Sequence, residues 1–481
     1  MTRFGPGSTA RWILGVAGAM ALASCTSEKV VYRSTPAFTT PPTAAANFVG
    51  YSQPTTKQTV CGNCHVDQQA KWLQTKHSSA WADLQASGHA SAACVACHSV
   101  SKLGNAATAD SVGYIATSDP RYQDVQCESC HGAGLQHVTA PALGNRPLAS
   151  IAVDTGSAIN SGCGECHTGT HEPFVDEWRV SKHSNVEAAA VSGGTECQGC
   201  HTAQGALQAF GVNTAYLEQG QVSTKPLAIV CAVCHDPHSP ANGKQLRFSV
   251  SSTDPTQNLC VRCHQRRSAP DPTSSRGPHS PEGPTLLGYA GWWPPSFQLV
   301  GGDTIVATHG SASNPNLCAT CHVARFAVND PKTGNLTFQA TGHKFVAIPC
   351  LDSNGLPTTG TCDISQRTFA ACTGSGCHGS QDVARSAMIT VGQRITTLEN
   401  TLSGMIAKVP KTEFSTTDTR FTTGEGAQFN LQLAQSAGSY VHNPFLIEAL
   451  LTASIKQITL DYGIAPSNRV DLRNILRSTA H

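Results

Sequence analysis

The stretch Cys61-Gly62-Asn63-Cys64-His65 is the first of eight in which two cysteines, separated by two residues, are followed at once by a histidine. The others are CVACH at 94–98, CESCH at 127–131, CGECH at 163–167, CQGCH at 197–201, CAVCH at 231–235, CVRCH at 260–264 and CATCH at 318–322. This spacing is typical of covalent haem attachment, in which two thiols bind the vinyl groups of one porphyrin and the histidine binds the iron. Zinc is the weaker interpretation, because a zinc ribbon pairs one CxxC with another and needs no histidine in the fifth position.

A ninth attachment site is expected near the C-terminus, where Cys372, Cys377 and His378 form a C-x4-C-H variant. It resembles the expanded haem-binding motif of some small multihaem cytochromes. A second interpretation stays open, because Cys362 and Cys377 enclose a long loop that resembles the attachment motif of some extracellular cytochromes. In both interpretations His378 binds the iron.

The 21 cysteines of the chain fit a scheme of about nine haems c. The predicted attachment residues are Cys61, Cys64, Cys94, Cys97, Cys127, Cys130, Cys163, Cys166, Cys197, Cys200, Cys231, Cys234, Cys260, Cys263, Cys318, Cys321, Cys372 and Cys377. The predicted proximal iron ligands are His65, His98, His131, His167, His201, His235, His264, His322 and His378. Cys350 and Cys362 flank a loop that contains glycine, proline and asparagine, so we expect them to form a disulfide, with two free thiols as the alternative.

The remaining cysteine, Cys25, lies at the end of a predicted export signal. Arg3 and Arg11 precede an apolar stretch from Trp12 to Leu22, which ends in Leu-Ala-Ser-Cys. These last four residues resemble the bacterial lipobox, in which the signal is cut before a cysteine that then carries lipid. The absence of aspartate after the cysteine favours the outer membrane in the sorting rule that this resemblance implies. Haem attachment and disulfides also suit an exported protein.

The composition predicts a mainly α-helical protein with extensive loops and a core packed with haem. Only 13% of the residues are charged and 6% are aromatic, whereas 43 are glycine and 27 are proline. Such a chain is not expected to bury a conventional core, so we expect neighbouring haems to touch one another. The formal net charge is +1. Because each haem adds two propionates, the holoprotein should be acidic, which argues against nucleic acid as a partner.

The motif spacing indicates an internal duplication. The first cysteines of six motifs fall at 61, 94 and 127, and then at 163, 197 and 231. Trp72 and the segment 75–78 recur as Trp178 and the segment 181–184. We therefore expect an array of trihaem units. The predicted domains are a signal peptide at 1–24, a lipid anchor with a flexible linker at 25–58, trihaem repeats at 59–140 and 141–245, a region with three haems at 246–380, and a helical region at 381–481.

Histidines outside the motifs are the candidates for the sixth iron ligands, which decide between electron transfer and catalysis. The predicted distal ligands are His77, His89, His137, His183, His238, His279, His309, His343 and His442. His89 and His171 have no partner in the other repeat, and only one of the two is needed for nine irons. We prefer His89, and we leave out His481 because it is the last residue.

Methionine is nearly excluded as a ligand, because only Met388 and Met405 lie beyond the signal, both on the apolar stripe of a predicted helix. Two histidines on each iron should therefore dominate, and the reduction potentials should be low. The alternative is that one iron lacks a sixth protein ligand. That haem would then be an open site for a small substrate such as nitrite or hydroxylamine.

The C-terminal part of the chain is predicted to be helical. Apolar residues repeat at steps of three and four from Ala384 to Val409, which predicts one long helix. A second helical stretch is expected over 426–440 and again over 445–462, where Pro444 suits a first helical turn. Together these stretches predict a C-terminal helical hairpin, with His442 just outside the resumed helix.

The CxxCH series, the W-x4-H-S element, CHDPH, GHKF and the terminal VHNP resemble multihaem c-type cytochromes. The nearest resemblance is to the superfamily of hydroxylamine oxidoreductase, its tetrahaem electron carrier and the surface cytochromes of metal-reducing bacteria. It covers residues 61 to about 462 and implies electron transfer more than it implies an enzyme. The lysine-ligated CxxCK motif of pentahaem nitrite reductase and octahaem tetrathionate reductase is absent from this chain.

Three functions are compatible with these patterns. The favoured one is a lipid-anchored carrier of electrons along about nine haems, at the outer membrane or cell surface, to other redox proteins or extracellular acceptors. The second is an oxidoreductase that acts on nitrite, hydroxylamine or tetrathionate at one open haem. The third is a subunit of a cytochrome filament. No catalytic residue is assigned from the sequence.

Overall fold

The computed structural model describes residues 38–153, 162–169, 171–212, 215–274, 276–295, 297, 304–329, 332–374, 377–415 and 420–467. The chain divides into two units, Met1–Thr39 and Thr40–His481, and every element described below belongs to the second. The predicted signal peptide, Cys25 and His481 lie outside the described residues.

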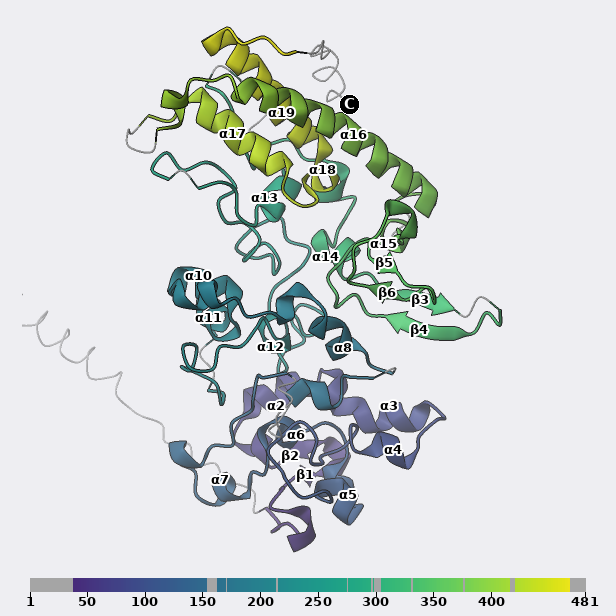
Figure 1. Ribbon diagram of the computed structural model, residues 1–481. Helices are drawn as coiled ribbons and strands as arrows, with labels where there is room; N and C mark the ends of the chain where they lie inside the picture. Colours follow the sequence, from purple (N-terminus) through teal and green to yellow (C-terminus); the bar gives the residue numbers. More distant parts are fainter. Residues whose placement is uncertain are drawn as a thin grey trace, which may run out of the picture. The chain divides into compact units, whose positions relative to one another are not determined.

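Short helices joined by long loops make up most of the fold, as Figure 1 shows, so the prediction of a mainly α-helical chain with extensive loops is confirmed. The helices before residue 380 are α2 (Val66–Trp72), α3 (Ala80–Ala86), α4 (Ala92–Val95), α5 (Gly113–Thr117), α6 (Cys127–His131), α7 (Leu135–Thr139), α8 (Phe174–Arg179), α9 (Ala188–Ser192), α10 (Thr195–His201), α11 (Ala203–Ala209), α12 (Cys231–Cys234), α13 (Glu282–Leu286), α14 (Cys318–His322) and α15 (Ala370–Thr373). The later helices are α16 (Gln381–Ile406), α17 (Thr423–Ala434), α18 (Ser439–His442) and α19 (Pro444–Tyr462).

The strands of the described residues form three small antiparallel pairs. They are β1 (Tyr51–Gln53) with β2 (Gln58–Thr59), β3 (Phe326–Asn329) with β4 (Leu336–Ala340), and β5 (Cys350–Leu351) with β6 (Pro357–Thr358). In the third pair Cys350 lies opposite Thr358.

Several motifs form a single turn of helix. Helix α6 spans CESCH, α14 spans CATCH, and α10 ends with CQGCH. In an α-helix, side chains three residues apart share a face, so the two cysteines of such a motif point to the same side. The CxxCH spacing and the local helix therefore both favour two thiols that reach one porphyrin.

The C-terminal helices have well-defined ends. Ser380 caps α16 by accepting a hydrogen bond from the amide of Val383, and Thr422 forms a capping box with Glu425 at the start of α17. Asn443 caps α19, in which Pro444 occupies the first turn. The predicted long helix is therefore present as α16, and the later helical stretches are present as α17 and α19.

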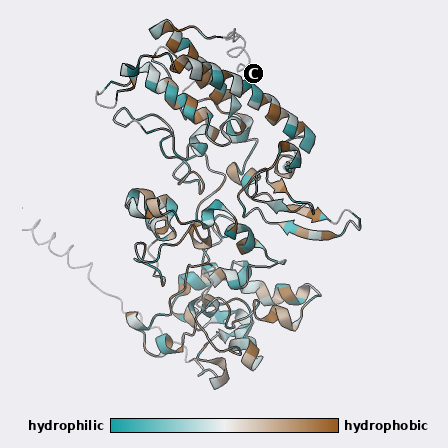
Figure 2. Ribbon diagram, viewed as in Figure 1, coloured by the Kyte–Doolittle hydropathy of each residue, from teal (hydrophilic) through white to brown (hydrophobic). Residues whose placement is uncertain are grey.

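Helices α16, α17 and α19 lie side by side and pack around one apolar core (Figure 1). Leu402, Leu433, Leu446 and Leu451 are fully buried in it. In Figure 2 these helices carry hydrophobic residues interspersed with hydrophilic ones, as amphipathic helices do. The expectation that the chain buries no conventional core was therefore wrong for this part, because the low overall aromatic and apolar content conceals a concentration of leucine and isoleucine there.

The stretch before residue 58 also differs from the expected flexible linker. Phe48 and Val49 are fully buried, and the Tyr122 hydroxyl donates to the Phe48 carbonyl oxygen at 2.9 Å. The carboxylate of Glu128 accepts hydrogen bonds from the backbone amides of Val49 and Gly50. Residues 45–51 therefore pack against residues 122–128, and the few apolar residues in a Thr- and Pro-rich stretch make this contact.

The two repeats share local hydrogen bonds as well as spacing. The Trp72 indole donates to the carbonyl oxygen of Val125 at 2.9 Å, and the Trp178 indole donates to that of Ile229 at 2.8 Å. The amides of these same two acceptor residues donate to the carbonyl oxygens of His77 and His183, respectively. The tryptophan thus fixes the backbone next to the histidine in each repeat.

Among the described residues, no helix combines the length and apolar character that a bilayer-spanning segment requires.

Candidate haem sites

We number the nine candidate attachment sites in chain order, from site 1 (Cys61, Cys64, His65) to site 9 (Cys372, Cys377, His378). At eight of them the ring of the motif histidine faces the ring of a second histidine. The pairs are His65–His137 at site 1, His131–His238 at site 3, His167–His77 at site 4, His201–His279 at site 5, His235–His343 at site 6, His264–His183 at site 7, His322–His442 at site 8 and His378–His309 at site 9.

The separation of the paired rings fits one iron between them. Their centroids lie 6.0 Å apart at site 5 and 6.4 Å apart at site 1, and the other six pairs fall within this interval. A metal–imidazole bond of about 2 Å, with the ring centroid roughly 1.1 Å beyond the nitrogen, gives about 6.2 Å for two histidines on one metal. The separation is nearly constant although the angle between the ring planes varies from 21° at site 6 to 65° at site 7, which an iron ion between the rings explains better than ring packing does.

Site 2 differs from the other eight. Within the described part of the chain, no histidine ring faces His98 in this way. His89, the preferred ninth distal candidate, and His171, its alternative, are both exposed, and neither forms such a ring pair. Eight of the nine histidines proposed as distal ligands thus lie opposite a motif histidine, and His89 does not.

Burial keeps several non-motif histidines neutral. It lowers the pKa of His77, His183, His343 and His442 to about 4, with a smaller contribution in the same direction from the facing motif histidine. At neutral pH these rings therefore carry a free lone pair on one nitrogen. An imidazole binds iron in this neutral form.

Backbone carbonyl groups orient many of the rings. The Nδ1 atoms of four motif histidines and of His309 lie 2.7–3.0 Å from a carbonyl oxygen. The pairs are His98 with Ala80, His131 with Pro147, His235 with Lys244, His322 with Phe345, and His309 with Val441. Such a bond fixes Nδ1 as the donor and leaves Nε2 for the metal.

Carboxylates take the place of the carbonyl group at other sites. Nδ1 of His264 lies 3.3 Å from Glu282, and those of His167 and His201 each lie 3.5 Å from Glu172 and Glu187. The hydrogen bond with Glu282 raises the pKa of His264. A carboxylate partner makes an imidazole a stronger donor to iron than a carbonyl partner does. Sites 4, 5 and 7 are therefore electronically distinct from sites 3, 6 and 8.

Buried polar side chains hold the distal segments in place. Glu177 accepts hydrogen bonds from the amides of Thr341 (2.8 Å) and His343 (2.7 Å), which secures the GHKF segment opposite site 6. The Asn443 side chain donates to the carbonyl oxygens of Thr285 and Ile305 and so secures the segment that carries His442. Sequence patterns gave no signal for these anchors, because each joins residues that are far apart in the chain.

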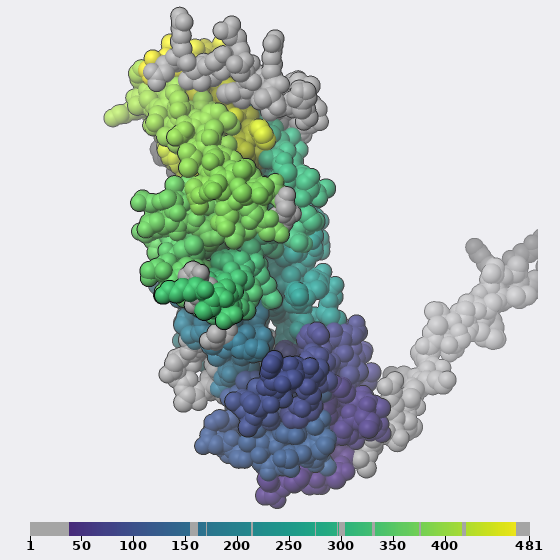
Figure 3. Space-filling model, turned by 90° about the vertical axis from the view of Figure 1, so that its right-hand side faces the viewer, coloured from purple at the N-terminus to yellow at the C-terminus, as the bar shows by residue number. Residues whose placement is uncertain are grey.

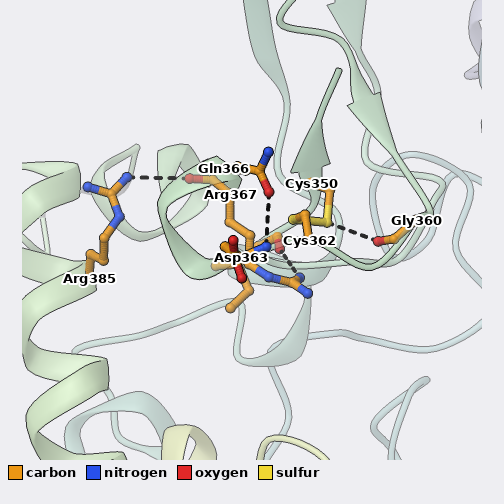
Figure 4. The surroundings of a disulfide bond; sticks show 8 residues. Cys350, Gly360, Cys362, Asp363, Gln366, Arg367 and Arg385 are labelled. Carbon is orange, nitrogen blue, oxygen red and sulfur yellow. Dashed lines mark hydrogen bonds between the residues drawn. A yellow bond between two sulfur atoms is a disulfide. The ribbon is translucent and has the colours of Figure 1, made fainter. Parts of the chain in front are cut away.

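The predicted disulfide between Cys350 and Cys362 is confirmed, and Figure 4 shows it beside β5. Cys350 also contacts the carbonyl oxygen of Gly360, and Arg367 donates to that of Ile348. Because Cys362 is already bonded, the structure favours Cys372 with Cys377 as the attachment pair of site 9.

Cysteines of different sites interact with one another. The thiol of Cys61 interacts with Cys127, Cys163 with Cys231, and Cys260 with Cys318. Weaker electrostatic interactions, without a hydrogen bond, relate Cys130 to Cys163, Cys234 to Cys263, and Cys321 to both cysteines of site 9. These contacts connect sites 1, 3, 4, 6, 7, 8 and 9 in that order.

Sites 2 and 5 lie beside this series rather than in it. Cys97 of site 2 interacts with Cys166 of site 4, and Cys200 of site 5 interacts with Cys263 of site 7. Both are the second motif of their repeat. The duplication visible in the sequence is therefore also visible as a repeated side branch.

Two segments match known protein families. Residues 60–132, which contain sites 1–3, match the family described as cytochrome c554 and c-prime. Residues 225–269, which contain sites 6 and 7, match the doubled CXXCH motif family.

Curated relatives share part of the chain. The C-type polyheme cytochrome OmcB of Geobacter sulfurreducens (strain ATCC 51573 / DSM 12127 / PCA) is 30% identical over 200 residues, which are 36% of this chain and 25% of the relative. The C-type polyheme cytochrome OmcC of the same strain is 26% identical over 206 residues, which are 36% of this chain and 26% of the relative. The matched part thus spans about a quarter of the length of these relatives.

Two solved structures resemble the chain at low sequence identity. The outer cell wall cytochrome OcwA gives a TM-score of 0.47 with 17% identity, over 76% of this chain and 75% of that one. The undecaheme cytochrome from the S-layer of Carboxydothermus ferrireducens gives a TM-score of 0.49 with 18% identity, over 96% of this chain and 74% of that one.

Proposed function

We propose that the chain is a multihaem c-type cytochrome that carries electrons along nine covalently attached haems at the outer membrane or cell surface. Its partners would be other redox proteins or extracellular electron acceptors. The observation that carries this proposal is the series of eight imidazole pairs whose attachment cysteines contact those of neighbouring sites.

The contacts between sites support long-range electron transfer. Each thioether sulfur is bonded to the porphyrin edge, so neighbouring sulfurs bring neighbouring porphyrins together. Electron tunnelling depends steeply on the distance between such edges. Sites 1 and 9 stand at the two ends of the contact series, and this arrangement suits a conductor with separate points of electron entry and exit.

The ligand set supports low reduction potentials. Two imidazoles stabilise ferric iron more than a histidine and a methionine do. Carboxylate partners at sites 4, 5 and 7 favour the ferric state further. Electrons would therefore leave the protein readily toward acceptors of higher potential.

The cellular location rests on the N-terminal sequence. A signal of residues 1–24 and a lipidated Cys25 would place the haem region on the outer membrane. A Cys25→Ala variant should lose its lipid and appear in the soluble fraction with its haems attached. Membrane retention of that variant would contradict lipid anchoring.

The test of electron transfer uses the full chain, produced in a bacterium with a cytochrome c maturation system. The mass of the intact protein should exceed that of the processed polypeptide by nine haems. A spectroelectrochemical titration should show reversible reduction over a broad range of negative potentials, and the reduced protein should be reoxidised by both soluble ferric citrate and ferric oxide particles. A mass equal to that of the bare polypeptide, or haems that stay reduced with both acceptors, would contradict the proposal.

A further inference from the structure

Site 2 is the one candidate site whose proximal histidine faces no other histidine in the described part of the chain. The internal duplication supplies a direct comparison. Site 5 is the second motif of the second repeat, as site 2 is of the first, and His201 of site 5 faces His279 at 6.0 Å. The same position in the two repeats is thus paired in one case and unpaired in the other.

The proximal histidine of site 2 is nevertheless held in place for iron binding. Nδ1 of His98 donates to the carbonyl oxygen of Ala80 at 2.8 Å, which leaves Nε2 for iron. The next residue, Trp81, donates its amide to Asp124 at 2.9 Å, and Asp124 in turn pairs with Lys57 at 3.0 Å. His98 is therefore oriented as firmly as the motif histidines of the paired sites.

His89 and His171, the two distal-ligand candidates that face no motif histidine, do not fill the unpaired position in this structure. His89 lies in the continuously exposed stretch 85–93, between α3 and α4, and His171 is exposed beside α8. Figure 3 shows the violet to blue α3–α4 segment at the surface of the face in view. Cys94, the first cysteine of site 2, directly follows this exposed stretch.

Site 2 is also connected to the rest of the protein at one point. Its Cys97 interacts with Cys166 of site 4, while no other site's cysteine is in comparable contact with Cys94 in the described chain. Site 2 is therefore the end of a branch from site 4 and lies beside an exposed segment, a position at which a small molecule could reach the iron.

We propose that the haem of site 2, held by Cys94, Cys97 and His98, keeps its sixth position open and binds a small exogenous ligand with a lone pair on carbon, nitrogen or oxygen. This goes beyond the proposed electron carrier, although it relies on the same haem attachment. The ligand would reach the iron from the side opposite His98, next to the exposed stretch 85–93.

Carbon monoxide is a suitable probe, because it binds ferrous haem that lacks a sixth protein ligand. We expect the dithionite-reduced holoprotein to bind one CO per chain, and the oxidised protein to contain one high-spin and eight low-spin ferric haems by electron paramagnetic resonance. A Cys94→Ala/Cys97→Ala variant should contain eight haems by mass and bind no CO. If that variant does not fold, His279→Ala provides a second test, because opening site 5 should raise the CO stoichiometry from one to two.

His89→Ala and His171→Ala test the competing assignments. Both variants should keep one CO per chain and an unchanged ferric spectrum. A wild-type protein that binds no CO, with His89→Ala or His171→Ala gaining one, would assign that histidine as the ligand and overturn the proposal. CO binding that persists in the eight-haem variant would also overturn it, because the open iron would then lie elsewhere.

These outcomes are separate from the proposed function. Nine low-spin haems that are reduced and reoxidised normally, with no CO bound, would remove the ligand site and leave the electron carrier intact. Loss of haem attachment as a whole would remove both, and the intact mass distinguishes the two results.

Discussion

The ring of His77, in the first repeat, faces the ring of His167, in the second, with 6.2 Å between their centroids. The same relationship recurs one unit later, where His183 of the second repeat faces His264 at 6.2 Å. Each repeat thus offers a ligand to the first site of the following unit. An iron bound by both histidines would join consecutive repeats by metal coordination in addition to their packing.

Replacing His77 should open site 4. In a His77→Ala variant we expect one low-spin ferric haem to become high-spin, and the reduced protein to bind one more CO than the wild type, because the iron loses its sixth ligand. Electron paramagnetic resonance and CO titration measure this. The matched control is Lys76→Ala, which removes the neighbouring exposed side chain and should leave both readouts unchanged. An unaltered spectrum of His77→Ala would show that another group binds site 4.

Removing a carboxylate partner should raise a reduction potential. In Glu282→Gln the His264 ring loses its carboxylate neighbour and becomes a weaker donor, so ferric iron at site 7 is stabilised less. We expect one component of the potentiometric titration to shift upward while the others stay in place. Glu399→Gln changes a carboxylate on α16 that makes no such contact and serves as the control. A downward shift at site 7 would contradict this electronic role.

Glu177, whose carboxylate holds the GHKF segment, should not tolerate replacement of one carboxylate oxygen by an NH2 group. Glu177 accepts from the amide of His343 and from both the amide and hydroxyl of Thr341. In Glu177→Gln one acceptor oxygen becomes an NH2 group that faces a donor, so we expect a loss of about 1–3 kcal/mol in the free energy of unfolding. The ferric haem of site 6 should also gain high-spin character, which electron paramagnetic resonance measures. A destabilised variant with an unchanged site 6 would show that Glu177 supports the fold without positioning His343.

Glu128 should make the reduction potential of site 3 depend on pH. Burial raises its pKa to about 7, although three backbone amides that donate to it oppose this shift. Deprotonation as pH rises through 7 adds a negative charge next to site 3, which favours the ferric state, so the potential should fall with increasing pH. Potentiometric titrations between pH 6 and 8 should show a smaller slope in Glu128→Gln than in the wild type. Equal slopes in both proteins would assign the pH dependence to other groups, such as the propionates.

Mass spectrometry of cysteine variants can show which cysteines form the disulfide and which attach the ninth haem. A Cys350→Ser/Cys362→Ser variant should keep nine haems and lose roughly 2–4 kcal/mol of stability, as expected for removal of a disulfide. Cys372→Ala should instead alter attachment at site 9, giving eight haems or one that is released by acid denaturation. If the Cys362 variant loses a haem and Cys372→Ala does not, the long-loop attachment is correct.

The positions of the attachment motifs could be read from the sequence because the covalent chemistry needs a local spacing. The histidine pairs could not, since His235 meets a ring supplied by His343, far along the chain. Counting histidines against irons pointed to eight residues that do lie in pairs. The ninth choice, His89 in preference to His171, was made to fill the last iron, and neither histidine faces a motif histidine in the described residues. The packing of Phe48 and Val49 against the first repeat could not be predicted, because two apolar residues give no periodic pattern.

The pairs between repeats have a consequence for biosynthesis. His167 faces a partner that precedes it in the chain, whereas His235 faces His343, which is synthesised much later. A polypeptide truncated before residue 343 would therefore lack the second histidine of site 6. Residue 343 is thus a point before which truncation leaves site 6 incomplete, whereas sites 1 and 3 already have both of their histidines.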